Sequence, residues 1–171
     1  MKIIKTKFKD LIIVKTKKNF DKRGYLSEVF NNKILKVKFK FQLVSCSKKN
    51  VVRGLHFQKK NAQGKLITIF KGSVYDVAVD LRKNSKTFGK YFSVILSAKN
   101  SKSFYIPPGF AHGFCTLEDN TIMHYNLTNL RDKKNEVGIL WNDPDINIKW
   151  PTKKPIVSKK DQQNIYFKDF F

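Results

Sequence analysis

The 171-residue sequence predicts an all-β fold, a sandwich or barrel built from many short strands. Two observations carry this prediction. Apolar and polar residues alternate along many short segments, and turn-forming residues separate those segments at near-regular spacing. No long segment has the apolar period of a helix, and there are no repeats, low-complexity linkers or breaks in composition. We therefore expect one domain over residues 1–171.

The alternating segments locate the strands. Residues 36–43 read Lys-Val-Lys-Phe-Lys-Phe-Gln-Leu, which predicts a half-buried strand over 37–43. Further strands, separated by turn signals rich in Asn, Asp, Ser, Pro and Gly, are expected at 65–70, 73–81, 91–97, 103–106 and 121–128. Ser158 and Asp161 have capping-box spacing and predict a short C-terminal helical segment.

The charge of the chain is strongly positive, at +22. Such a charge invites a nucleic-acid-binding interpretation, a basic β-barrel with aromatic stacking platforms. The cations, however, are nearly all lysines spread along the whole chain, and Phe39 and Phe41 alternate with their lysines as core residues do. We favour a solvated lysine surface, no specific nucleic acid partner, and a field that attracts anionic substrates.

Cysteine and histidine usage narrows the class of protein further. Cys46 and Cys115 form neither a disulfide framework nor a zinc-site spacing, and Leu11-Ile12-Ile13-Val14 is too short for a signal or membrane segment. We expect a reduced, cytoplasmic protein with no membrane attachment. His56, His112 and His124 form no His-x-His or His-x-x-x-His pair, so we expect no metal.

The segment from Arg53 to Lys65 carries the chemistry. It sets a guanidinium at Arg53, an imidazole at His56, a carboxamide at Gln58 and an ammonium at Lys65 within thirteen positions. An imidazole takes a proton near neutral pH, a fixed cation stabilises an oxyanion, and an arginine fork suits a phosphate. Together they favour proton abstraction beside a carbonyl on a phosphorylated substrate. The alternative for His56 alone is a hydrogen-bonded core histidine, but unpaired flanking charges are costly in an apolar core.

Other candidates have competing interpretations. His124 and Tyr125 are neighbours on an expected strand, so their side chains point to opposite faces, and His124 is expected to be structural if Tyr125 faces a cavity. His112, after Pro107-Pro108-Gly109, either lines a pocket or pins its loop by hydrogen bonds to backbone. Arg82 is expected to pair with a local acid.

Several sequence blocks, in order along nearly the whole chain, resemble the dTDP-4-dehydrorhamnose 3,5-epimerase family of deoxysugar biosynthesis. The blocks are D-K-R-G-Y-L-S-E-V-F at 21–30, R-G-L-H-F-Q at 53–58 with G-K-L at 64–66, D-V-A-V-D-L-R at 76–82, P-G-F-A-H-G-F at 108–114, Tyr125 with T-N at 128–129, W-N-D-P-D at 141–145 and S-K-K-D at 158–161.

The resemblance implies a metal-free jelly roll of the cupin type that needs no cofactor. It implies a homodimer with exchanged N-terminal strands and a nucleotide-diphosphate sugar as substrate. The implied reaction inverts carbons 3 and 5 of dTDP-4-keto-6-deoxyglucose, in rhamnose biosynthesis for cell-surface polysaccharides. Each inversion removes a proton next to the carbon-4 ketone through an enolate and returns one to the other face.

The same resemblance implies roles for named residues. His56 is the base, Asp161 its partner, Tyr125 the acid on the opposite face, and Lys65 the enolate-stabilising cation, with His112 beside the sugar. From the residues alone, Asp161 is a helix cap and Tyr125 a strand aromatic with a solvent-exposed hydroxyl. The implied substrate-binding residues are Arg23 and Arg53 at the diphosphate, with Arg23 and Glu28 reaching across from the other subunit, and Gln58 and Glu136 near the ligand.

Two departures from the family pattern concern the nucleotide. Phe41-Gln42-Leu43-Val44 replaces a polar run, and Leu130-Arg131 stands where the family commonly has a tyrosine that stacks on the base, so either Arg131 stacks there or the nucleotide differs. An enzyme that inverts a single carbon of another nucleotide-linked 4-keto sugar needs the same base and acid and remains an alternative. A catalytically inactive scaffold is disfavoured by the retained His56, Lys65, Tyr125 and Asp161.

Overall fold

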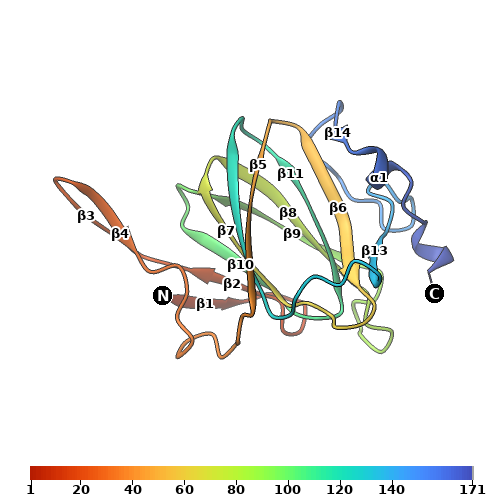
Figure 1. Cartoon of the computed structure of the whole chain (residues 1–171), viewed down its shortest axis with the longest axis horizontal. Coiled ribbons are helices and arrows are strands. Elements are labelled where there is room, and N and C mark those ends of the chain that lie inside the picture. The colour runs from red at the N-terminus through yellow and green to blue at the C-terminus, as the bar shows by residue number, and fades with distance from the viewer. Residues whose placement is uncertain (171) are drawn as a thin grey trace.

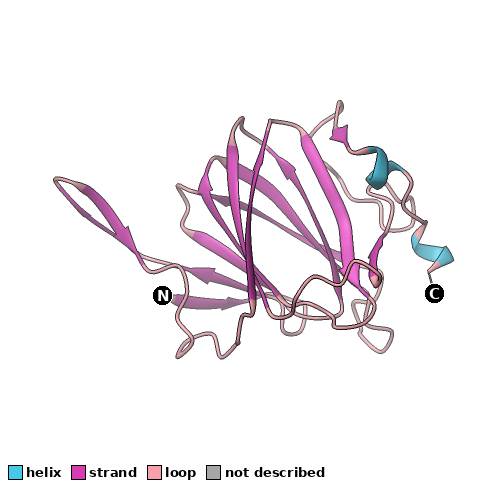
Figure 2. Ribbon diagram, viewed as in Figure 1, coloured by secondary structure: helices cyan, strands magenta, loops and turns pink. Residues whose placement is uncertain are grey.

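Two β-sheets face each other in a jelly roll (Figures 1 and 2), seen in a computed structural model that describes residues 1–170. The first sheet is antiparallel throughout and has the order β1-β2-β10-β7-β12-β5. In that order, its strands span Lys2–Lys5, Ile12–Lys15, Lys102–Ile106, Lys65–Lys71, Thr121–Leu127 and Phe41–Ser47.

The second sheet has the order β13-β6-β11-β8-β9. Its strands span Glu136–Gly138, Val51–Gln58, Phe110–Thr116, Ser73–Asp80 and Tyr91–Ser97. The two-residue strand β14 (Ile156–Val157) adds to β6 in parallel. It leads into α1 (Lys159–Gln162) and a 3-10 turn, η1 (Phe167–Asp169), which lie beside β6 and β13 at the C-terminal end of the molecule (Figure 1).

Strand β8 is buried on both faces, so the outer face of the second sheet must also be covered. Val74 and Ala78 belong to the apolar cluster between the sheets, whereas Val77 and Val79 pack in a second cluster with Ile139, Ile146 and Ile148. Burial of each of these Val and Ile side chains contributes about 1.5–3 kcal/mol. The irregular segment after β13 therefore closes the outer face of this sheet.

The strands expected from sequence are confirmed, with one correction. The strand predicted at 91–97 matches β9 (Tyr91–Ser97), and the other later strands agree to within a residue at each end. The strand predicted over 37–43 begins only at Phe41. Val37 and Phe39 instead pack, without a strand partner, on Val14 and Leu66 at the outer face of the first sheet. The alternation there reflects packing of an irregular segment.

A separate hairpin, formed by β3 (Lys18–Asp21) and β4 (Gly24–Ser27), extends away from the two sheets (Figure 1). Its strands pair only with each other, and its apolar side chains Phe20 and Leu26 are 73% and 78% exposed. Large apolar groups rarely stay this exposed on an extended element unless another surface covers them. No helix among residues 1–170 is long and apolar enough to cross a membrane.

Candidate active site

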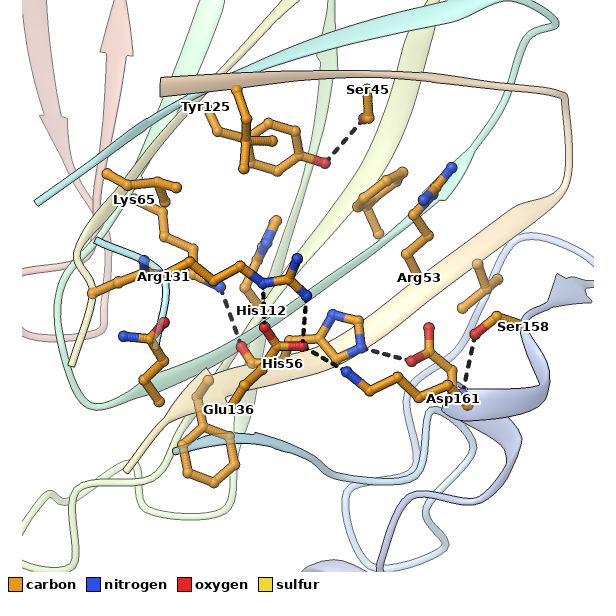
Figure 3. Close-up of a pocket in the computed structure, with 18 of the residues that line it drawn as sticks. Ser45, Arg53, His56, Lys65, His112, Tyr125, Arg131, Glu136, Ser158 and Asp161 are labelled. Atoms are coloured by element: carbon orange, nitrogen blue, oxygen red, sulfur yellow. Dashed lines mark hydrogen bonds and ion pairs between the residues drawn. The ribbon is translucent and has the colours of Figure 1, made fainter. Parts of the chain in front are cut away.

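A cavity of about 590 Å³ lies between the two sheets, and it collects most of the residues predicted from sequence (Figure 3). The first sheet supplies residues of β5, β7 and β12, and the second supplies residues of β6, β11 and β13, with the C-terminal segment at one side. The predicted residues among its lining are Arg53, His56, Gln58, Lys65, His112, Tyr125, Arg131, Glu136 and Asp161.

An irregularity in β6 brings Arg53 and His56 to the same cavity. His112 of β11 lies opposite His56 and Phe114 lies opposite Arg53, so three steps along β6 match two along β11. In a regular strand, residues 53 and 56 point to opposite faces. The extra residue is a β-bulge, which re-aims side chains in this way.

Two glycines permit this bulge. Gly54 has φ +128°, and a Cβ there would lie 2.6 Å from Gly113 Cα and 2.8 Å from the carbonyl oxygen of His112. A Cβ on Gly113 would in turn lie 2.9 Å from the carbonyl oxygen of Arg53. The backbones of β6 and β11 therefore approach each other more closely than any side chain allows.

His56 forms a dyad with Asp161. Nε2 of the imidazole lies 2.6 Å from Oδ1 of Asp161 (Figure 3). Oδ2 accepts a hydrogen bond of 3.2 Å from Gly54 N–H. Burial by itself favours the protonated carboxyl, but the hydrogen bonds from His56 and Gly54 outweigh it and lower the pKa of Asp161. The ionised carboxylate thus fixes the ring and leaves Nδ1 of His56 free for a substrate.

The C-terminal segment is held at several points, which fixes Asp161. Asp161 N–H donates to Oγ of Ser158, the N-cap of α1, so the predicted cap is confirmed while the Asp161 carboxylate is left for His56. Beyond α1, the carbonyl of Ile165 accepts a hydrogen bond from Leu140 N–H. The buried carboxylate of Asp143 accepts one of 2.7 Å from Phe167 N–H.

Tyr125 approaches the cavity from the opposite sheet. Its side chain is 9% exposed, and its hydroxyl lies 3.2 Å from that of Ser45 on β5, so the solvent-exposed alternative is wrong. Burial raises the pKa of Tyr125 well above its ordinary value, so the phenol keeps its proton. As predicted, His124 points to the other face, where it stacks on Phe70.

Lys65 supplies a partly desolvated cation inside the cavity. Its Nζ donates to the carbonyl oxygen of His56 at 3.3 Å. Desolvation lowers the pKa of Lys65 to about 8. The ammonium form still prevails at pH 7, and a cation with so little water around it interacts strongly with a nearby anion.

His112 lines the cavity and pairs with a carboxylate rather than with loop backbone. Its Nε2 lies 2.9 and 3.1 Å from the two carboxyl oxygens of Asp76 on β8. Asp76 was not among the residues predicted from sequence. A signal was present, since Asp76 lies between Val74 and Ala78 on the side of β8 that faces the apolar cluster between the sheets.

The mouth of the cavity carries a cluster of charges. Glu136 accepts hydrogen bonds from Arg131 Nε at 2.7 Å and from Lys160 Nζ at 2.6 Å. The bond from Arg131 is the main cause that lowers the pKa of Glu136 to about 2. Lys160, which sequence reasoning missed, lines the cavity next to Asp161. Arg53 reaches Oγ of Ser47 at 3.2 Å.

Arg23 and Glu28 lie outside the cavity of their own chain. Arg23 is on the projecting hairpin, where its guanidinium pairs with Asp21 at 2.6 Å, and Glu28 accepts a hydrogen bond from Asn31. Arg82 pairs with Asp80 at 2.8 Å, which confirms its expected structural role. Within residues 1–170, no three His, Cys, Asp or Glu side chains group as a metal site would require.

Comparisons with known proteins agree on one family. A sequence model described as dTDP-4-dehydrorhamnose 3,5-epimerase matches residues 5–169. The dTDP-4-dehydrorhamnose 3,5-epimerase of Shigella flexneri is 46% identical, with 99% of this chain and 97% of that protein covered. The enzyme of the same name from Escherichia coli K12 is 43% identical, with 95% and 92% covered.

Solved structures are equally similar. The dTDP-6-deoxy-D-glucose-3,5-epimerase of Legionella pneumophila, in complex with dTDP-4-keto-L-rhamnose, has a TM-score of 0.93 and 38% identity, with 96% of this chain and 92% of that chain covered. The dTDP-4-dehydrorhamnose 3,5-epimerase of Bacillus anthracis, with TDP and pyrophosphate bound, has the same TM-score and 41% identity, with 96% and 98% covered. The chain therefore belongs to the dTDP-4-dehydrorhamnose 3,5-epimerase family.

Proposed function

We propose that this protein converts dTDP-4-keto-6-deoxyglucose to dTDP-4-keto-L-rhamnose by inverting carbons 3 and 5. The observation that carries the proposal is a cavity with the His56–Asp161 dyad on one sheet, Tyr125 on the other and the Lys65 ammonium inside. Inversion next to a ketone needs a base on one face of the sugar and an acid on the other. Family membership, and a relative solved with dTDP-4-keto-L-rhamnose, supply the substrate class.

His56 is the base in this proposal. Asp161 holds the Nε2 side of the ring, so Nδ1 takes the proton from the sugar carbon, and the carboxylate stabilises the imidazolium that results. The electron pair of the broken C–H bond moves toward the carbon-4 oxygen, which becomes an enolate oxygen. Lys65 stabilises that charge by its ammonium group.

Tyr125 is the acid in this proposal. A phenol with a raised pKa keeps its proton until a strongly basic carbon forms beside it, and burial raises the pKa of Tyr125 in this way. Return of a proton from the face opposite His56 inverts the carbon. Ser45, at 3.2 Å from the phenol oxygen, orients the hydroxyl.

The nucleotide diphosphate is held by the cations at the cavity mouth. Arg53 and Arg131 offer planar guanidinium groups suited to phosphate, and Arg131 also suits stacking on a base. We assign Gln58, Glu136 and His112 to substrate binding as well. The field of the +22 chain draws the anionic substrate toward these groups.

The hairpin is assigned to a homodimer with exchanged N-terminal strands. Its support is that β3 and β4 pair with no other strand within residues 1–170 and expose Phe20 and Leu26. In such a dimer, Arg23 and Glu28 reach the cavity of the partner subunit. We also infer a cytoplasmic location, where the free thiols of Cys46 and Cys115 stay reduced.

Incubation with dTDP-4-keto-6-deoxyglucose in deuterated water tests the proposed reaction. NMR of the recovered sugar reads deuterium at carbons 3 and 5, and we expect label at both together with inverted configuration. Label and inversion at one carbon only would instead identify a single-carbon epimerase. The absence of label at either carbon would refute the reaction for this substrate.

A further inference from the structure

The buried pair of His112 and Asp76 has a ring nitrogen that faces the cavity without a protein partner. His112 is 5% exposed and Asp76 is 0% exposed, and both carboxyl oxygens of Asp76 lie within 3.1 Å of Nε2. Among residues 1–170, no hydrogen bond reaches Nδ1 of His112, although the residue lines the cavity. Nδ1 is therefore the atom that His112 offers to a ligand.

The charge of this pair restricts where its protons sit. Lys65 donates to the carbonyl of His56, and among residues 1–170 His112 is the sole ion-pair partner within 4.0 Å of Asp76. A buried pair with a net charge is costly, so the pair is most stable when it holds two protons, one between Asp76 and Nε2 and one on Nδ1. The first proton sits either on the carboxyl or on Nε2, and in both arrangements of this neutral pair Nδ1 carries a hydrogen.

We propose that Asp76 is a positioning residue that keeps a proton on Nδ1 of His112, so that His112 and Lys65 together donate hydrogen bonds to the carbon-4 oxygen as it becomes an enolate. The inference rests on the proposed epimerase function. His56 takes the proton from the sugar carbon and the charge passes to the oxygen, so no proton leaves His112. The cavity shared by His112, Lys65 and His56 gives these donors access to one substrate atom (Figure 3).

The environment of the pair supports this assignment. Burial raises the pKa of Asp76 and lowers that of His112, and both directions favour a pair without net charge. The groups that act on His112 are Asp76 from β8, Lys65 from β7 and His56 from β6, with the Tyr125 ring 6.3 Å away on β12. A donor that belongs to a pair without net charge, beside a cation, suits an oxyanion, because neither group must reorganise as charge develops.

Nitrogen-15 NMR of the imidazole rings tests the protonation state in the wild-type protein without substrate. The chain has three histidines, so His56→Asn and His124→Asn spectra assign the signals of His112. At about pH 7 we expect Nδ1 of His112 to be protonated. A spectrum with the proton on Nε2 and a bare Nδ1 would overturn the inference whatever the enzyme turns over.

Kinetics of two variants at Asp76 test its effect on the reaction. Asp76→Val removes the partner of Nε2, and we expect kcat for deuterium uptake to fall by about 10²–10³, as for loss of one oxyanion donor, with little change in KM. Asp76→Asn can still donate a hydrogen bond to Nε2 and keep Nδ1 protonated, so it should recover part of that loss.

Asp80→Asn is the matched control, because it alters a buried carboxylate on the same strand that pairs with Arg82 outside the cavity. It should leave kcat close to that of the wild type. Wild-type kcat in a folded Asp76→Val protein would refute the inference. Failure of the wild type to exchange deuterium would refute the epimerase function instead, and the NMR result would then stand on its own.

Discussion

The two ring nitrogens of His56 have different surroundings, and this difference suits the proposed role of His56 as the base. Nε2 is held by Asp161, a carboxylate that is 3% exposed, while Nδ1 faces the cavity. A base that is oriented from behind keeps the same nitrogen toward the substrate in every turnover. Its polar neighbours predicted His56 as the base, and the family resemblance implied Asp161 as its partner. The contact itself depends on the fold, which brings Asp161 to Nε2 across 105 residues.

Replacement of His56 tests this role. We expect His56→Asn to reduce turnover by roughly 10²–10⁴, the usual contribution of a general base. Deuterium uptake into the sugar measures the loss. His124→Asn is the matched control, since His124 stacks on Phe70 on the far face of its strand and should retain wild-type turnover. Near-normal uptake in His56→Asn would contradict the assignment.

From the proposed role of Lys65, we expect the reaction to slow at alkaline pH. Desolvation places its pKa at about 8, so the ammonium form is present below that pH and is lost as the pH rises through it. We expect kcat to fall on the alkaline side with a midpoint near 8. Lys65→Arg keeps its charge at much higher pH, so its slower reaction should lack this decline. An unchanged alkaline decline in Lys65→Arg would assign the titration to another group.

Strand β6 shows what alternation in a sequence predicts and what it does not. Apolar alternation and turn signals located β7, β8, β9, β10 and β12 to within a residue, because burial on one face sets a period of two. The bulge was not predicted, since it depends on pairing with β11. A regular strand would have sent Arg53 and His56 to opposite faces. Likewise, Val37 and Phe39 alternate with lysines but pack outside any strand.

Two glycine substitutions measure the close approach at the bulge. Gly54 and Gly24 have similar φ values, +128° and +133°, so an alanine at either costs of order 1–3 kcal/mol from backbone strain. Only at Gly54 does the new Cβ meet backbone, at 2.6 Å from Gly113 Cα. Thermal unfolding should therefore show a larger loss of stability for Gly54→Ala than for Gly24→Ala. Equal losses would show that β6 and β11 can separate easily.

At the scale of the whole molecule, the projecting hairpin connects the fold to its assembly. Arg23 and Glu28 resemble substrate-binding residues of the family, yet they lie outside the cavity of their own chain. Among residues 1–170, the strands of the hairpin pair with no strand outside it. These two facts have a common explanation if the hairpin completes the cavity of a second copy.

Complementation between two variants tests that explanation. Arg23→Ala and His56→Asn should each be impaired at low substrate concentration. In a mixed dimer, one cavity combines intact His56 with Arg23 from its partner, so an equal co-expressed mixture should recover about a quarter of wild-type activity. His56→Asn mixed with Tyr125→Phe is the control without recovery, because both residues line one cavity of the same chain. No recovery with Arg23→Ala would exclude exchange of the hairpin.

The central claim is that the two sheets present a base and an acid to opposite faces of one sugar. Deuterium uptake and inversion, measured on the same sample of Tyr125→Phe, test it most directly. Because His56 remains intact, we expect proton removal at the first carbon to continue while completed inversion falls much further. Equal loss of uptake and inversion would contradict this account and assign Tyr125 to substrate binding.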